Sequence, residues 1–295
     1  MNNYKNKLIS EVISTVKKIK TENPLTICLT NAVTINDCAN AILAINGSPA
    51  MTDYDKDIGD LVKIAKSLVI NLGMLNDDKI KGIYEGCTVA NQFNIPIVID
   101  PVAVGVTTNR NELILDLIAK FDISAIRGNI SEIKSIAKLL NLKEIEKLEI
   151  NTAKGVDASE NDLVNKNNLK QYTKIVEELS KYTNSVIIAS GPIDIISNGK
   201  TSYAIENGDE MATKITGSGC MLTSIVGSYI GVSNPLTGAI TGSLIMAIAE
   251  EQAKEYVDKD KSGTGTFRVK LIDYLSLMDD KTIKTYSRIN NVLND

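Results

Sequence analysis

Short apolar, β-branched runs alternate with longer amphipathic stretches through most of this chain, and this alternation restricts the fold more than any other feature. Buried parallel strands read as near-continuous apolar runs, and five such runs occupy residues 25–29, 67–72, 95–99, 123–126 and 185–189. Segments with helical periodicity lie near or between them, at residues 37–45, 58–67, 77–91, 111–120 and 132–140. Such alternation predicts an open, doubly wound α/β sheet with helices on both faces.

The remaining segments add further predicted elements and contain no boundary between domains. Residues 1–20 place apolar side chains at helical spacing among lysines, which predicts an amphipathic helix and not a signal sequence. Residues 193–197 and 202–205 predict a hairpin around Asn198-Gly199, and the pattern is then mostly helical to residue 290. The charged stretch 141–168, with Lys-Gly-Val-Asp at 154–157, is expected to be an excursion within one domain that spans residues 1–295.

Composition excludes several classes of protein. The chain of 295 residues has a net charge of −4 and no dense basic run, so nucleic acid is not expected as a partner. No apolar run reaches the roughly 20 residues of a membrane span, so we expect no membrane partner and a soluble, cytoplasmic protein. Its four cysteines lack metal-ligand or paired spacing, which fits a reducing compartment. Histidine is absent, so acid–base chemistry must use a carboxylate, thiol, lysine or tyrosine.

A glycine-rich turn leads into an apolar helical pattern between Thr213 and Ser228, which reads TKITGSGCMLTSIVGS. Gly217 and Gly219 allow the backbone to turn with several N–H groups on one side, and a helix that begins near Cys220 adds the positive end of its dipole. The segment therefore favours an anion site. Packing alone is an alternative reason for glycines before a helix.

Polar side chains follow two of the expected strands, at the edge where ligands bind in such sheets. Asp100 follows the run 95–99 and could hold Mg²⁺ or its waters, or cap a loop. After the run 123–126, either Asn129 or Ser131 could cap the next helix, with Glu132 as a first-turn acid. Capping accounts for Glu132 without a functional role.

Arg127 and Ser190 also lie at strand ends, and capping does not account for the arginine. A guanidinium fixed there suits bidentate recognition of phosphate, whereas the Ser190 hydroxyl could contact a nucleotide or close a turn. Together with two acids and the glycine turn, these groups are typical of phosphoryl transfer with Mg²⁺. The chain has no G-x-x-x-x-G-K-[ST] sequence, which excludes a P-loop enzyme.

Three asparagines, Asn31, Asn36 and Asn40, lie near the end of the first expected strand and on one helical face, ahead of a turn at Ser-Pro-Ala-Met 48–51. Asparagine is a poor residue for a helix interior. The three predict a small pocket that is partly polar and partly apolar, although solvent-facing caps are an alternative.

Several motifs in fixed order resemble the hydroxyethylthiazole kinase family of thiamin salvage: TNAVTINDCANAILAINGSPAM, GMLNDDKI, IVIDPVAVG, IRGNISEI, KGVDASE, IIASGPIDIISNG, ITGSGCMLTSIVGSY and SGTGTFRVKLIDYLSLMD. The resemblance covers residues 24 to about 280. It implies a ribokinase-like fold, with a central, mostly parallel sheet, helices on both faces and no separate lid domain. It also implies phosphorylation of the hydroxyl group of 4-methyl-5-(2-hydroxyethyl)thiazole by ATP with Mg²⁺, and a homotrimer with its pockets at subunit boundaries.

The same resemblance assigns roles to residues of this chain. It implies that Met51 and Gly217 bind the thiazole, that Arg127 and Ser190 bind the nucleotide, that Asp100 and Glu132 hold Mg²⁺, and that Cys220 is at the catalytic position. From the residues themselves we add Gly217 and Gly219 as catalytic, Asn129 as nucleotide-binding, and Asn31 and Asn36 as thiazole-binding. Cys220 stands where most ribokinase-like kinases have an aspartate base. We expect the helix start to lower its thiol pKa and the bound phosphates to oppose ionisation. The chain departs from the family at Ile27, where a histidine is usual, and at Thr52-Asp53-Tyr54.

Three other functions are compatible with parts of this pattern. A kinase for hydroxymethylpyrimidine or an ATP-dependent dehydratase that repairs hydrated nicotinamide nucleotides would share the fold, but either would favour aspartate at position 220. The dehydratase would also leave the Asn31 to Met51 segment unexplained. A nucleotide-binding module without catalysis would not require Asp100, Glu132 and the glycine turn together.

Overall fold

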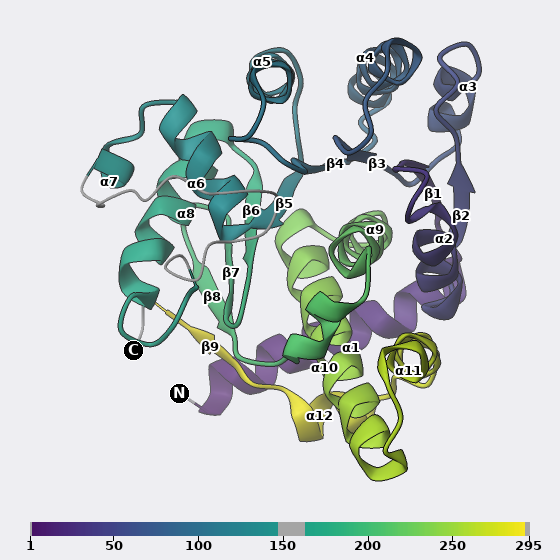
Figure 1. Cartoon of the computed structure of the whole chain (residues 1–295), viewed down its shortest axis with the longest axis vertical. Coiled ribbons are helices and arrows are strands. Elements are labelled where there is room, and N and C mark those ends of the chain that lie inside the picture. Colours follow the sequence, from purple (N-terminus) through teal and green to yellow (C-terminus); the bar gives the residue numbers. More distant parts are fainter. Residues whose placement is uncertain (1, 147–162, 293–295) are drawn as a thin grey trace.

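One mixed sheet organises the protein, for which a computed structural model describes residues 2–146 and 163–292. Within these residues the strands follow the order β2-β1-β3-β4-β5-β6-β7-β8-β9 (Figure 1). The parallel part comprises β1 (Leu25–Leu29), β2 (Ser48–Met51), β3 (Ser67–Asn71), β4 (Ile97–Asp100), β5 (Ala125–Asn129) and β6 (Val186–Ser190). The antiparallel part comprises β7 (Asp194–Ser197), β8 (Ser202–Ile205) and β9 (Ile289–Asn291).

Helices cover both faces of the sheet, as the strand–helix alternation predicts (Figure 1). One face carries α1 (Asn2–Glu22), α2 (Ile35–Ala44), α9 (Ser218–Ile230), α10 (Pro235–Asp260), α11 (Thr264–Ser276) and α12 (Asp280–Tyr286). The other carries α3 (Ile58–Lys63), α4 (Asp77–Gln92), α5 (Thr108–Lys120), α6 (Ile130–Leu139), α7 (Lys143–Glu146) and α8 (Leu169–Thr183). A 3₁₀ helix, η2 (Glu210–Lys214), precedes α9. No helix among the described residues is long and apolar enough to cross a membrane.

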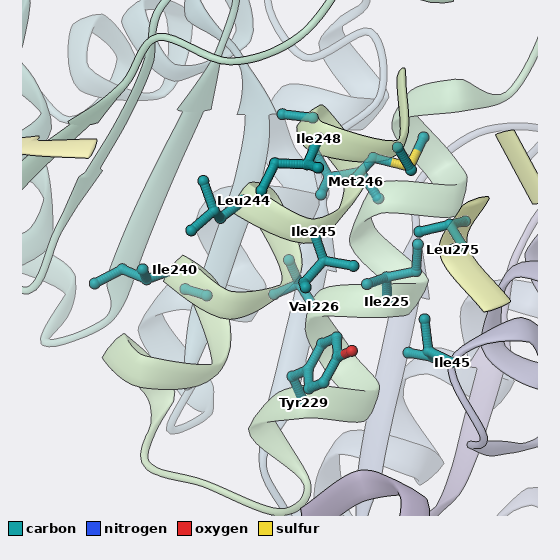
Figure 2. Close-up of a cluster of buried hydrophobic side chains, with 14 of the residues drawn as sticks. Ile45, Ile225, Val226, Tyr229, Ile240, Leu244, Ile245, Met246, Ile248 and Leu275 are labelled. Carbon is teal, nitrogen blue, oxygen red and sulfur yellow. The ribbon is translucent and has the colours of Figure 1, made fainter. Parts of the chain in front are cut away.

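Alternation along the central strands produces two hydrophobic cores. In β3, Leu68 and Ile70 face the layer with α4, whereas Val69 faces the layer with α9, because successive side chains of a strand point to opposite faces. On the face that carries α1 and α2, α9 packs against α10 through a cluster that includes Ile225 and Ile245 (Figure 2). The helix that follows the glycine turn is therefore held in the core along its length.

Two segments differ from the sequence-based prediction. Residues 48–51 were expected to form a turn, but they form the edge strand β2, parallel to β1 with Cys28 opposite Met51. Pro49 is tolerated there because an edge strand has one side free of ladder bonds. The helical pattern expected to continue to residue 290 ends at Tyr286, and β9 pairs with β8. The three residues of β9 are too few to show periodicity, and Pro49 makes β2 resemble a turn.

The other expected elements are confirmed with shifted ends. The N-terminal amphipathic helix and the hairpin around Asn198-Gly199 are present, whereas the helix expected at 58–67 ends at Lys63. Three of the cysteines, Cys28, Cys38 and Cys87, are buried free thiols. Residues 154–157 lie outside the described part of the chain.

Candidate active site

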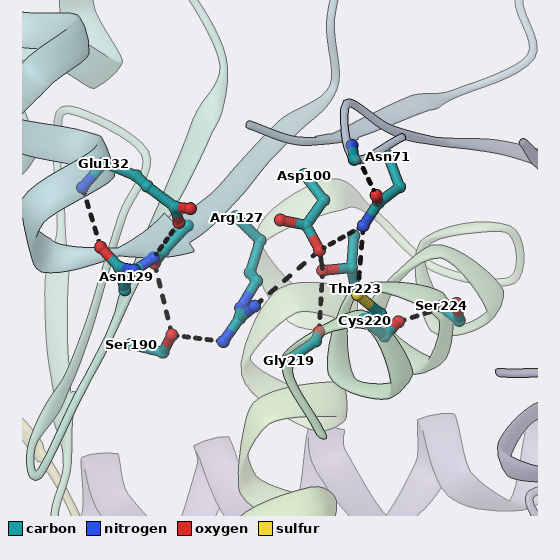
Figure 3. Close-up of polar contacts among 12 residues, drawn as sticks. Asn71, Asp100, Arg127, Asn129, Glu132, Ser190, Gly219, Cys220, Thr223 and Ser224 are labelled. Carbon is teal, nitrogen blue, oxygen red and sulfur yellow. Dashed lines mark hydrogen bonds and ion pairs between the residues drawn. The ribbon is translucent and has the colours of Figure 1, made fainter. Parts of the chain in front are cut away.

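The carboxyl ends of the parallel strands meet the start of α9, and the polar strand-end residues gather there (Figure 3). Strand register explains the pairs: Asn71 on β3 lies opposite Asp100 on β4, and Asn129 on β5 lies opposite Ser190 on β6. Neighbouring parallel strands thus place side chains from distant parts of the sequence side by side.

Asp100 is the buried acid at the centre of this cluster, with 2% of its surface exposed. Its Oδ2 accepts hydrogen bonds from Asn71 Nδ2 at 3.1 Å and Thr223 Oγ1 at 2.8 Å, and lies 3.9 Å from Arg127 Nη1. Burial raises the pKa of Asp100, and the charge of Arg127 opposes the rise. Within the described residues Oδ1 makes no hydrogen bond, so it can serve as a ligand.

Arg127 joins this acid to the glycine turn. Its Nη2 donates to Ser190 Oγ, and a Cβ added at Gly219 would lie 2.6 Å from its Nη1. The glycine therefore lets the guanidinium lie directly against the helix start. Arg127 Nε is buried and has no hydrogen-bond partner in the described part of the chain. A buried donor without a partner is costly, and a phosphate oxygen would satisfy it.

Glu132 forms a capping box with Asn129 at the start of α6. Asn129 Oδ1 accepts from Glu132 N–H and Glu132 Oε2 accepts from Asn129 N–H, both at 2.8 Å. Glu132 Oε1 also accepts from the Ala103 N–H at 3.0 Å. Of the two candidate caps, Asn129 is thus the one in use. Burial and the charge of Asp100 raise the pKa of Glu132 to about 7.

The glycine turn has the geometry of an anion site. Gly217 adopts φ +84°, and a Cβ there would lie 2.4 Å from Thr34 Cγ2. No side chain caps α9, and the Met221 N–H bonds to Gly217 O at 2.8 Å. The N–H groups of the first turn before Met221 therefore have no acceptor within the helix and are available to an anion.

Cys220 is half-buried at this helix start, between two asparagines. Its Sγ lies 3.2 Å from Asn71 Nδ2 and 3.5 Å from Asn31 Nδ2, and Asn31 Nδ2 also donates to Asn71 Oδ1 at 3.2 Å. The expected lowering of the thiol pKa is wrong as a net effect. Burial first, and the charge of Asp100 second, raise the pKa of Cys220 to about 12, so the thiol is protonated at neutral pH.

Comparison with known proteins identifies the family that this geometry belongs to. The model of the hydroxyethylthiazole kinase family matches residues 16–281. The chain belongs to this family. It is 47% identical to hydroxyethylthiazole kinase of Methanobrevibacter smithii over 97% of this chain and 98% of the relative. It is 44% identical to hydroxyethylthiazole kinase 2 of Methanosphaera stadtmanae over 96% and 99%.

Solved structures agree with the fold. The hydroxyethylthiazole kinase protein of Pyrococcus horikoshii superposes with a TM-score of 0.81 at 26% identity, over 95% of this chain and 98% of that one. A ribokinase-like protein of Enterococcus faecalis matches at a TM-score of 0.53 and 12% identity over 87% of each chain, which supports the fold alone. The expected ribokinase-like architecture is confirmed, and the chain is a kinase of the hydroxyethylthiazole kinase family.

Not every expected residue of the family's site joins this cluster within one chain. Asn31 does, but Asn36 is exposed and accepts a hydrogen bond from Asn40 Nδ2 at 3.0 Å. Met51 is half-buried at the end of the edge strand β2 and packs against the core.

Sequence reasoning missed two residues of the site, Asn71 and Thr223, and it also missed the burial of Lys79, whose Nζ donates to Thr30 O and Gly73 O. Asn71 ends an otherwise apolar strand, and that interruption is a signal that could have been used. Thr223 is hidden within an apolar helix, where its hydroxyl reads as part of the packing pattern. A lysine in an amphipathic helix normally faces solvent, so nothing in the sequence marked Lys79 as buried.

The described residues contain no group of three or more acidic, cysteine or histidine side chains that could enclose a metal. Mg²⁺ usually keeps several waters and binds through one or two carboxylates together with substrate phosphates. A pair such as Asp100 and Glu132 fits that mode, with Asp100 Oδ1 as the available ligand.

Proposed function

We propose that this chain transfers the γ-phosphoryl group of ATP to the hydroxyl of 4-methyl-5-(2-hydroxyethyl)thiazole, in thiamin salvage. The observation that carries the proposal is the uncapped start of α9, with the Arg127 guanidinium against Gly219 and Asp100 beside it. Phosphoryl transfer needs positioning and charge stabilisation above all. The bond from the γ-phosphorus to the oxygen that bridges it to the β-phosphorus breaks and releases ADP as the bond to the alcohol oxygen forms. The alcohol proton is lost late in the step, to solvent water.

The nucleotide side of the site would use Arg127, Ser190 and Asn129. Arg127 Nε, which is buried without a partner among the described residues, would donate to a phosphate oxygen. The Ser190 hydroxyl already orients the guanidinium, and Asn129 holds the strand-to-helix junction beside it. The first-turn N–H groups of α9 would receive the migrating charge, each contributing about 3 to 4 kcal/mol to transition-state stabilisation.

Asp100 and Glu132 would hold Mg²⁺, mostly through water. Asp100 offers an oxygen without a hydrogen bond from the described residues. Both Glu132 oxygens accept backbone N–H groups, so Glu132 would act through its charge or an intervening water. When bound, the ion neutralises charge on the phosphates.

The thiazole would bind on the other side, near Asn31, Asn36, Met51 and Gly217, at the boundary between subunits of a homotrimer. In support, apolar side chains that would suit an interface are exposed on and before α2: Val33, Ile35 and Leu43. We also propose that the homotrimer is cytoplasmic.

Replacing Cys220 with alanine should reduce kcat by no more than about 10²-fold, the lower end of what a general base contributes. The physical reason is that the thiol, with its pKa raised to about 12, is a poor proton acceptor at neutral pH. Steady-state kinetics at saturating ATP measures this effect. A loss above about 10⁴-fold in a folded variant would mean that the thiolate is indispensable.

The proposed function is tested by incubating the protein with ATP, Mg²⁺ and hydroxyethylthiazole and measuring the products by mass spectrometry. We expect the phosphate ester and ADP in equal amounts, and neither when Mg²⁺ is chelated. ATP hydrolysis without the ester, or no turnover at all, would overturn the proposal.

A further inference from the structure

Lys79 is a buried cation that the mechanism above does not use. Only 2% of the residue is exposed, and it is among the largest fully buried side chains of the described residues. Its Nζ donates to Thr30 O at 3.0 Å and to Gly73 O at 2.7 Å, and within the described part of the chain it forms no ion pair. Lysine is almost never fully buried without a charged partner, so this placement calls for a reason.

Stability does not supply that reason. Lys79 lies in the first turn of α4, where its backbone N–H bonds to the Asn76 cap at 2.8 Å. The positive end of the helix dipole disfavours a cation there, and burial of an ammonium is costly in itself. The cost appears as a pKa of Lys79 lowered to about 8, mainly by burial. A methionine of similar shape would fill the space without this penalty.

The two carbonyls that Lys79 binds belong to the loops that carry the asparagines around Cys220. Thr30 immediately precedes Asn31, after the end of β1. Gly73 lies two residues after Asn71, and its own N–H bonds to Asn71 Oδ1 at 2.9 Å. A single ammonium therefore ties together the β1–α2 and β3–α4 loops beneath the site.

From these loops the contacts continue to the reacting region. Asn31 and Asn71 bond to each other, and both side-chain amides reach Cys220 Sγ. Asn71 also donates to Asp100. If the two loops separated, both amides would move away from Cys220 and Asp100 would lose one hydrogen bond. The contacts of Lys79 therefore help to fix the side of the site that faces the alcohol.

We propose that Lys79 is a positioning residue for phosphoryl transfer, whose ammonium holds the β1–α2 and β3–α4 loops so that Asn31 and Asn71 are aligned with Cys220 and Asp100. The inference rests on the proposed function for its kinetic readout. Four charged or titratable groups face Lys79 from other elements. Asp53 after β2 and Asp100 on β4 favour its charged form, Arg110 on α5 opposes it, and the thiol of Cys220 on α9 is uncharged in the range where Lys79 titrates.

The test compares Lys79→Met with Lys81→Met, a control on the same helix whose lysine is exposed and bonds to Asp78. Lys79→Met should lower kcat by about 10- to 100-fold, since small misplacements at a site have effects of that size. KM for ATP should change less than threefold in Lys79→Met, which is the size of effect that one weak contact has on binding. Lys81→Met should have the kcat and KM of the wild type. Circular dichroism and thermal unfolding establish that each variant is folded.

The pH profile separates positioning from a merely structural role. Because Lys79 loses its charge as pH rises through about 8, kcat/KM of the wild type should fall above that pH, and Lys79→Met should lose this alkaline limb. Lys79→Arg, which keeps a cation that does not titrate there, should lose the limb while retaining more of kcat than the methionine variant. Burial also raises the pKa of Glu250 to about 8, and Glu250 is present in every variant. If its ionisation caused the fall in kcat/KM above pH 8, all the variants would keep that fall.

The inference is overturned if folded Lys79→Met has the wild-type kcat, or if its alkaline limb is unchanged. The same holds if Lys79→Arg is no more active than Lys79→Met although it folds. These outcomes require an active wild-type enzyme. A wild type that does not phosphorylate hydroxyethylthiazole instead contradicts the proposed function, so the two failures can be told apart.

Discussion

Replacement of Gly217 by valine should lower kcat by at least about 10³-fold, because it disrupts more than one of the N–H donors at the start of α9, each worth about 10²- to 10³-fold. Valine strongly disfavours the φ of +84° found at this position. Its Cβ would also lie 2.4 Å from Thr34 Cγ2, so the turn must shift. Steady-state kinetics on the folded variant measures the effect.

Gly265→Ala is the matched control for this substitution. Gly265 lies in α11, and a Cβ there would have no atom within 4 Å, so kcat should be unchanged. If folded Gly217→Val keeps kcat within about tenfold of the wild type, which is less than the loss of one such donor, then the glycine turn does not stabilise the transferred phosphoryl group.

Removal of the Arg127 guanidinium should have the other large effect. Arg127→Met should reduce kcat/KM for ATP by about 10³- to 10⁵-fold, the range found when an arginine that stabilises phosphoryl transfer is lost. The substitution removes the cation 3.9 Å from Asp100 Oδ2 and the donor to Ser190. It should also raise the pKa of Asp100 further, because Arg127 is the main group that opposes the effect of burial.

Arg288→Met provides the comparison for the arginine. Arg288 directly precedes β9, its half-exposed side chain pairs with Glu251 on α10, and neither residue belongs to the cluster around Asp100. Exposed ion pairs contribute about 0 to 1 kcal/mol to stability. We expect a small change in thermal stability and none in kcat/KM. Equal losses in the two variants would show that Arg127 acts through stability and not through the nucleotide.

The sequence was sufficient for the parts of the fold that repeat a pattern. Buried parallel strands and amphipathic helices each carry a period, and the predicted alternation matches β1 and the strands β3 to β6. The edge strand β2 was missed because its four residues include Pro49 and resemble a turn. The last strand, β9, has three residues and follows a helix directly, so local pattern could not identify it.

A site residue could be predicted where its type and its position at a strand end implied its chemistry. It could not be predicted where its pKa or its burial depends on tertiary packing. Arg127, Asp100 and the glycine turn could be named from position alone. The pKa of Cys220 could not, because it depends on burial and on the charge of Asp100, which is far away in sequence. Lys79 could not be found either, since only the folded chain brings its ammonium to the carbonyls of Thr30 and Gly73.

The most direct test of phosphorylation of the thiazole alcohol at this site is a comparison of two substrates. The kcat/KM for hydroxyethylthiazole is divided by the kcat/KM for hydroxymethylpyrimidine, both measured on the wild-type protein with ATP and Mg²⁺. We expect a clear preference for the thiazole, at least about tenfold, since a difference in pocket contacts of 1–3 kcal/mol gives 10- to 200-fold discrimination. Turnover of the pyrimidine with none of the thiazole would contradict it.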